Sequence, residues 1–158
     1  MKKSLRAGLG FGLTSAVITT LGLMIGLNAS TGSKLAVIGG ILTIAIADAF
    51  SDALGVHVSK ETEEGAIAKE VWEATAFTFL FKFLFALTFL IPVIFLSMNI
   101  AIIVSIIWGL GILSILSYKM AQSQGQSRWE SLYEHLGVAI AVLILSNFLG
   151  HLIADYFR

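Results

Sequence analysis

The chain has 158 residues, of which 57% are hydrophobic and 13% are charged, and its formal net charge is zero. A soluble domain is about 45–50% apolar and about 25% charged, so this composition excludes an ordinary soluble protein and indicates a polytopic protein of the lipid bilayer. The balanced charge gives no general attraction to nucleic acid. The absence of cysteine excludes disulfides, thiolate metal sites and cysteine nucleophiles.

The first apolar segment, residues 7–29, follows a basic head and matches the roughly 20 residues needed to cross the hydrocarbon core. Two pairs of glycines repeat at four-residue spacing in this region, Gly8 with Gly12 and Gly22 with Gly26. Such spacing lets helix backbones approach closely, so we expect this helix to pack tightly against its neighbours. Its hydroxyl side chains are expected to satisfy backbone carbonyls; they belong to Thr14, Ser15, Thr19 and Thr20.

The second apolar segment, residues 35–58, carries Asp48 and Asp52 one helical turn apart. A carboxylate at the bilayer centre costs at least about 2.5–3.5 kcal/mol on insertion scales, and such residues usually mark a functional site. No proline interrupts the polar run that comes next, so we expect the second helix to extend into the cytoplasm as far as residue 73, although Gly65 weakens the helix and leaves a break there open. That extension carries five acids: Glu61, Glu63, Glu64, Glu70 and Glu73.

Three further apolar segments lie at residues 74–96, 100–117 and 131–157. Their length favours helices over the alternating strands of about ten residues that build a membrane barrel. We therefore predict an all-α polytopic membrane protein with five transmembrane helices, organised as one domain over residues 1–158.

The basic residues predict how this protein is oriented in its membrane. With five crossings, seven of them share one side: Lys2, Lys3, Arg6, Lys60, Lys69, Lys119 and Arg128. The other side has only Lys34 and Arg158. Because cytoplasmic loops are enriched in lysine and arginine, we expect a cytoplasmic N-terminus and an external or lumenal C-terminus.

A lysine in the third apolar segment bears on the charge of the two aspartates. Lys82 lies at about the depth of Asp52, so an Asp52–Lys82 ion pair is expected. One lysine cannot neutralise two aspartates, so the second must be protonated, hydrated or bound to a cation. A hard divalent ion suits the paired carboxylates of Asp48 and Asp52, and proton exchange is the other natural use. The structural alternative is a buried ionic clamp in a non-transporting membrane subunit.

Other residues that could carry chemistry give weaker signals. No nucleophile–base grouping, phosphate loop or zinc-site spacing is present, so we expect neither an enzyme nor a bound cofactor. His57, His135 and His151 are expected to be interfacial or packing residues, with His57 at most an accessory ligand. The glutamate run could concentrate cations at a pore mouth, although such a run is more often a solvated charged helix.

Several motifs in chain order carry a family resemblance. Gly12-Leu13-Thr14 stands early in the first helix, and ADAFSDALGVHVSKETE fills residues 47–63, with an acidic link, a proline-bearing third helix and two closing helices after it. This arrangement resembles the vacuolar iron transporter family over nearly the whole chain. It is most specific at residues 47–59, where the family shows an Ala-Asp-Ala-x-Ser-Met-x-x-Gly-like run.

The resemblance implies a function and an assembly. Members have five membrane helices with a cytosolic N-terminus, and they move Fe²⁺ and often Mn²⁺ out of the cytosol, commonly in exchange for protons. The implied assembly is a homodimer with the ion pathway between protomers, fed by glutamates beyond the second helix. The nearest counterparts of those glutamates here are Glu61, Glu64, Glu70 and Glu73.

Two positions depart from the family pattern. Asp52 stands where the family has a metal-binding methionine, and Phe11 stands where it has an aspartate in the first helix. Loss of that aspartate removes a ligand, whereas Asp52 supplies a hard oxygen in place of a soft sulfur. The departures imply a site moved onto the second helix and an ion harder than Fe²⁺, such as Mn²⁺.

These observations lead to one main expectation and two alternatives. We expect a dimeric exporter of a divalent transition metal in which the glutamates collect the ion and Asp48 and Asp52 pass it through the membrane. A protonation change accompanies transport, and Lys82 balances the aspartates' charge when the ion is absent. The alternatives are a non-transporting subunit with an Asp–Lys clamp, and a pathway for protons or monovalent cations.

Overall fold

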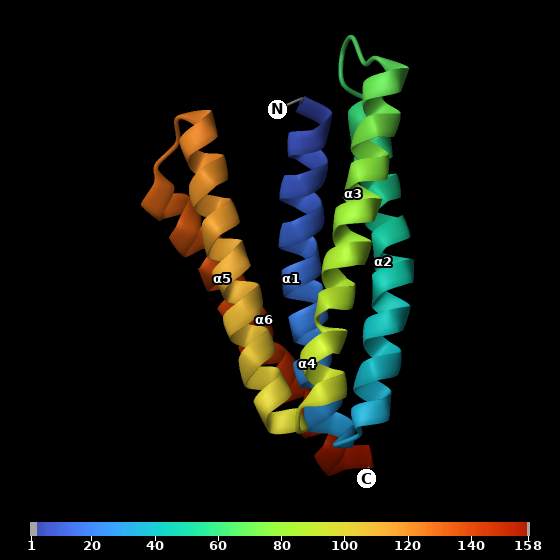
Figure 1. The fold of residues 1–158 in the computed structure, drawn as a ribbon, viewed down its shortest axis with the longest axis vertical. Coiled ribbons are helices and arrows are strands. Elements are labelled where there is room, and N and C mark those ends of the chain that lie inside the picture. The colour runs from blue at the N-terminus through green and yellow to red at the C-terminus, as the bar shows by residue number, and fades with distance from the viewer. Residues whose placement is uncertain (1–2, 158) are drawn as a thin grey trace.

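The computed structural model describes residues 3–157, and within them the chain is helical with no β-strand (Figure 1). The helices are α1 (Lys3–Thr31), α2 (Lys34–Glu61), α3 (Ala68–Thr88), α4 (Leu90–Phe95), α5 (Met98–Gln124) and α6 (Arg128–Phe157). Five spans, with α3 and α4 forming one, are long and apolar enough to cross a membrane. The predicted all-α fold with five helices of this length and composition is confirmed. Lys2 and Arg158, which were counted in predicting the orientation, lie outside the described residues.

The predicted continuation of the second helix to residue 73 is wrong. Helix α2 ends at Glu61, and the chain turns before α3 begins at Ala68. Gly65 has a φ of +75°, in the left-handed region that an α-helix of L-residues does not use. Residues 68–73 therefore form the first turns of α3 instead of a rod continuing from α2.

Pro92 breaks the third span close to its C-terminal end. Helix α3 ends at Thr88 and α4 begins at Leu90, with Pro92 in the first turns of α4. Pro92 has no amide hydrogen to donate to the carbonyl of Thr88, four residues earlier, so the helical ladder is interrupted there. Elsewhere the helices run up to seven residues beyond the predicted apolar segments, because their polar flanks continue the same helical turns.

Helix α1 occupies the centre of the bundle, and its glycines determine how close its neighbours lie. A Cβ atom on Gly12 would lie 2.9 Å from the carbonyl oxygen of Thr78 in α3. A Cβ atom on Gly22 would lie 2.9 Å from Cγ1 of Val142 in α6. The two glycine pairs therefore face different partners, and the close packing expected from their spacing is confirmed.

Figure 1 shows that the α5–α6 hairpin diverges from α1, α2 and α3 toward the end of the bundle where the chain begins. The loops that join α2 to α3 and α5 to α6 both lie at this end, and the chain finishes at the opposite one. Large apolar side chains are exposed along the outer helices, including Leu42, Ile46, Phe50 and Leu54 on α2 and Ile144, Phe148 and Leu149 on α6. A bilayer would cover such an exterior.

Candidate functional site

The charged residues of two spans face each other at the middle of the bundle. Asp48 lies 14 residues after Lys34 and 13 before Glu61, which are the ends of its span. Lys82 lies 14 residues after Ala68 and 13 before Phe95. At about 1.5 Å per residue, each is roughly 20 Å from either end of its span. Lys82 is therefore level with Asp48, whereas the prediction placed it at the depth of Asp52.

The ammonium group of Lys82 joins three oxygens from two neighbouring helices. Its Nζ donates a hydrogen bond to Oδ2 of Asp52 and another, 2.8 Å long, to Oγ of Ser15. It also lies 2.5 Å from Oδ2 of Asp48. That last contact is an ion pair. The predicted Asp52–Lys82 pair is confirmed, and the structure adds Asp48 and Ser15 to it.

Ser15 reaches the lysine because α1 and α3 approach closely at Gly12. The position of a Cβ atom on Gly12 is 3.3 Å from the backbone nitrogen of Lys82 itself. Ser15 lies three residues later on the same face of α1, next to the lysine side chain. The expectation that the Ser15 hydroxyl satisfies a backbone carbonyl is wrong, because its partner is Lys82, whereas the hydroxyl of Thr19 does donate to a carbonyl, at 2.8 Å.

The cluster is unevenly buried and unevenly charged. The Lys82 side chain is 1% exposed, whereas the side chains of Asp48 and Asp52 are 27% and 18% exposed. Counting ionised side chains, two carboxylates face one ammonium, and one unit of negative charge is left over. An uncompensated charge that is largely shielded from water is unfavourable, so a further positive charge beside the carboxylates would stabilise the cluster.

Asp48 is the carboxylate that can be reached from outside the cluster. It borders a groove of about 550 Å³ between α1 and α2. The lining also includes the hydroxyl residues Thr19, Thr43 and Ser51, while Asp52 is not part of it. The Thr43 hydroxyl donates its hydrogen to the Gly39 carbonyl at 2.8 Å. Its oxygen keeps lone pairs that can accept a hydrogen bond or bind a metal ion. The groove therefore offers oxygen ligands beside one partly exposed carboxylate.

The glutamates proposed as metal ligands lie apart from the aspartates. Glu61 is the last residue of α2, Glu64 is in the turn, and Glu70 is in the first turn of α3. Glu73 accepts a hydrogen bond of 2.9 Å from Oγ of Ser4. Across residues 3–157, the structure contains no group of three or more acidic or histidine side chains placed to hold a metal ion. The glutamates border the α2–α3 hairpin and do not complete the site at mid-span.

Comparisons of the chain with known protein families, curated proteins and solved structures find no match. The function must therefore be inferred from the side chains of the site, since a helical bundle alone does not imply one.

Proposed function

We propose that the chain is a transporter of a divalent transition metal, Fe²⁺ or Mn²⁺, which it exports from the cytosol with a linked protonation change. The observation that carries the proposal is the two-to-one ratio of Asp48 and Asp52 to Lys82 at the middle of the spans. Ionisable groups at this depth are costly, and they usually mark the route of an ion. The resemblance to the vacuolar iron transporter family adds to this proposal.

Lys82 acts in this proposal as a tethered cation that fills the site when no metal is bound. A divalent ion moving along the groove between α1 and α2 meets Asp48 first, since that carboxylate borders the groove. The ammonium then releases Asp48 and keeps its hydrogen bonds to Asp52 and Ser15. The metal would convert the excess negative charge of the cluster into an excess positive one, which is why transport of the ion is linked to a protonation change in this proposal.

The ligand atoms favour a hard ion. Two carboxylates and the hydroxyl groups of the groove present only oxygen, without the sulfur that softer ions prefer. We therefore expect Mn²⁺ to be carried at least as well as Fe²⁺. In the proposed orientation, Glu61, Glu64, Glu70 and Glu73 lie on the cytosolic side and raise the local concentration of cations near the membrane.

A second copy of the chain completes the proposal. Leu42, Ile46, Phe50 and Leu54 are exposed on α2, the helix that also carries Asp48. A homodimer, as the family resemblance implies, would cover apolar surface on this helix and enclose the Asp48 groove between protomers. Lipid would cover the rest of the exterior.

The test is transport of Mn²⁺ into proteoliposomes containing the purified protein. An Asp48→Asn/Asp52→Asn double variant should lose flux by about tenfold or more, a barrier increase of about 1.4 kcal/mol for each factor of ten. The matched control is Asp155→Asn, which removes an exposed carboxylate near the end of α6. Unchanged flux in a folded double variant would reject the proposal.

One observation favours the clamp alternative. An ammonium group has three hydrogens to donate, and three oxygens surround the one on Lys82, from Asp48, Asp52 and Ser15. A static clamp would need no more than this. The two functions respond differently when one aspartate is neutralised, because a clamp loses stability whereas a transport site loses flux.

A further inference from the structure

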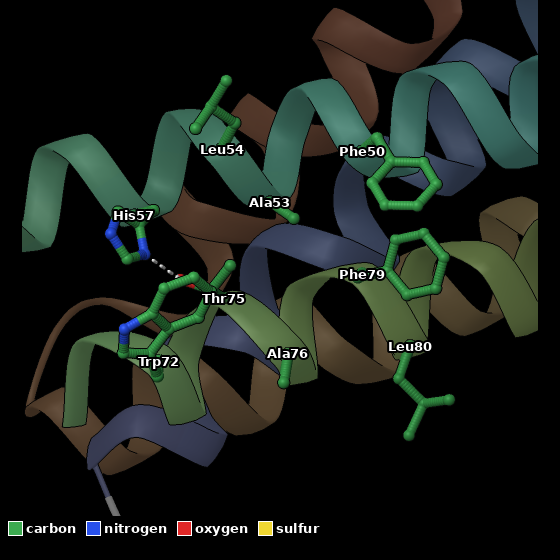
Figure 2. Close-up of a pocket in the computed structure, with 9 residues that line it drawn as sticks. All are labelled: Phe50, Ala53, Leu54, His57, Trp72, Thr75, Ala76, Phe79 and Leu80. Carbon is green, nitrogen blue, oxygen red and sulfur yellow. Dashed lines mark hydrogen bonds between the residues drawn. The ribbon is translucent and has the colours of Figure 1, made fainter. Parts of the chain in front are cut away.

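The hydrogen-bond pattern around His57 determines which ring nitrogen carries its hydrogen. His57 lies near the cytoplasmic end of α2, and its Nδ1 is 3.0 Å from Oγ1 of Thr75 in α3 (Figure 2). The Thr75 hydroxyl already donates its single hydrogen to the carbonyl of Val71, at 2.8 Å. With the hydroxyl hydrogen on the Val71 carbonyl, Nδ1 of His57 is the donor to Thr75, and in the neutral ring Nε2 keeps a free lone pair.

The His57 ring is held by a second contact as well. Its centroid lies 4.5 Å from that of Trp72, with an angle of 62° between the two planes. Figure 2 shows the His57 ring projecting from α2 toward α3, where the Trp72 ring and the Thr75 side chain face it. Metal-binding histidines almost always donate their other ring N–H to a fixed acceptor, which sets both the tautomer and the ring orientation. His57 has this arrangement, and its Nε2 is the ring nitrogen that would bind a metal ion.

Glu61 brings a carboxylate to the same place. It lies four residues after His57 on the same face of α2, and both residues line a pocket of about 200 Å³ beside the start of α3. The neighbouring Lys60 is engaged elsewhere, in an ion pair of 2.5 Å with Glu63. Within residues 3–157, no ion pair involves the Glu61 carboxylate, so it is open to a cation.

We infer that Nε2 of His57 and the carboxylate of Glu61 form a docking site for a divalent transition metal, with water completing the coordination. The inference rests on the proposed function for the use of the bound ion. Two protein ligands give weak binding, which suits a site that the ion must leave. Asp52 is five residues from His57 along α2, or roughly 8 Å, so the docking site is separate from the mid-span cluster.

The imidazole supplies a selectivity that the aspartates lack. Carboxylate and hydroxyl oxygens suit Mg²⁺ and Ca²⁺ as well as Mn²⁺, whereas an imidazole nitrogen favours transition metals over those two ions. A histidine on the cytosolic side therefore selects among divalent ions before they reach Asp48. In this arrangement, the site at His57 and Glu61 selects the ion, and the site at Asp48 and Asp52 passes it through the membrane.

The experiment tracks the histidine nitrogens by NMR in the full-length protein, reconstituted in lipid nanodiscs and titrated with Co²⁺. We expect the His57 Nε2 signal to respond at a lower Co²⁺ concentration than the signals of the other histidines. An excess of Mg²⁺ should not suppress this response. Glu61→Gln and Thr75→Val should each weaken it by about 10–100-fold, through loss of a ligand and of the ring's anchor respectively.

The matched control histidine is His135, whose ring is fixed in the same way. Its Nδ1 lies 2.8 Å from Oγ of Ser117, and that hydroxyl donates to the carbonyl of Leu113 at 2.7 Å. His135→Gln should leave the His57 response unchanged. An equal response of His57 and His135 to Co²⁺, or an undiminished response in Glu61→Gln, would overturn the inference.

The same titration separates this inference from the proposed function. In the Asp48→Asn/Asp52→Asn variant, which should not transport, the His57 response is expected to persist. If that response holds while the wild-type protein carries no Mn²⁺, the docking site stands and the transport proposal falls. If Mn²⁺ flux is present but the His57 response is missing, the docking site falls and the transport proposal stands.

Discussion

Nζ of Lys82 lies 2.5 Å from Oδ2 of Asp48, yet the lysine side chain is 1% exposed and the aspartate side chain 27% exposed. The positive partner is thus sealed inside the bundle, while the negative partner retains an open edge toward the groove between α1 and α2. An ion that arrives along the groove can reach the carboxylate without first passing the lysine. The transport proposal needs this asymmetry, and substitutions within the cluster test it.

The variant Asp52→Asn should separate a transport site from a clamp. The carboxamide keeps an oxygen that can accept from Lys82, and the excess negative charge of the cluster disappears. We expect a folded protein with a raised melting temperature, about 2–4 °C for each kcal/mol gained, and loss of Mn²⁺ flux. Thermal unfolding and proteoliposome flux are the measurements. A fall in melting temperature together with dissociation in detergent would instead favour the clamp.

The variant Lys82→Met should make stability depend on metal. It leaves Asp48 and Asp52 without their ammonium partner, and removing one member of a buried ion pair typically costs about 3–5 kcal/mol. We expect a lowered melting temperature that Mn²⁺ restores in part, because the bound ion supplies the missing positive charge. Lys69→Met, at an exposed position, is the control. If Mn²⁺ raises both melting temperatures equally, the mid-span cluster is not where the ion binds.

The five spans and the Asp52–Lys82 pair could be predicted because each follows from residue types that are visible in the sequence. Long apolar runs are sufficient to predict the five spans, and a lysine in an apolar helix needs an acidic partner at its own depth, which gave the Asp52–Lys82 pair. The end of α2 at Glu61 was not predicted, because a polar run without proline gives no strong stop and Gly65 only left a break open. The left-handed φ of Gly65 is visible only in the folded chain.

The part played by Ser15 shows a second limit. A serine in an apolar helix has a carbonyl one turn away to bond with, so its sequence context does not indicate a distant partner. Only the approach of α1 to α3 brings its hydroxyl to within 2.8 Å of Lys82. The position of Ser15 three residues after Gly12 was the available signal, since close helix contacts extend along one face. The metal, the dimer and the glutamates' role remain predictions.

The variant Ser15→Ala tests whether this hydroxyl holds the lysine during transport. Loss of a hydrogen bond to a charged group costs about 1.5–3 kcal/mol, so the melting temperature should fall. Flux should fall as well, because Lys82 would have only Asp52 to retain it once Asp48 binds the metal. The control is Ser114→Ala, which removes a hydroxyl that donates to the carbonyl of Leu110 within its own helix. Normal flux in Ser15→Ala would confine that hydroxyl to a structural role.

The final prediction concerns the helix contact that assembles the site. In Gly12→Ala, the new methyl group would meet the Thr78 carbonyl oxygen at 2.9 Å, and backbone atoms cannot move aside as a flexible side chain can. We expect a loss of about 1–3 kcal/mol in stability from overpacking, together with reduced Mn²⁺ flux as Ser15 shifts away from Lys82. Gly111→Ala is the matched control, since nothing lies within 4 Å of its added Cβ. That control should gain up to about 1 kcal/mol from helix propensity, so effects of the same sign in the two variants would contradict the close contact between α1 and α3.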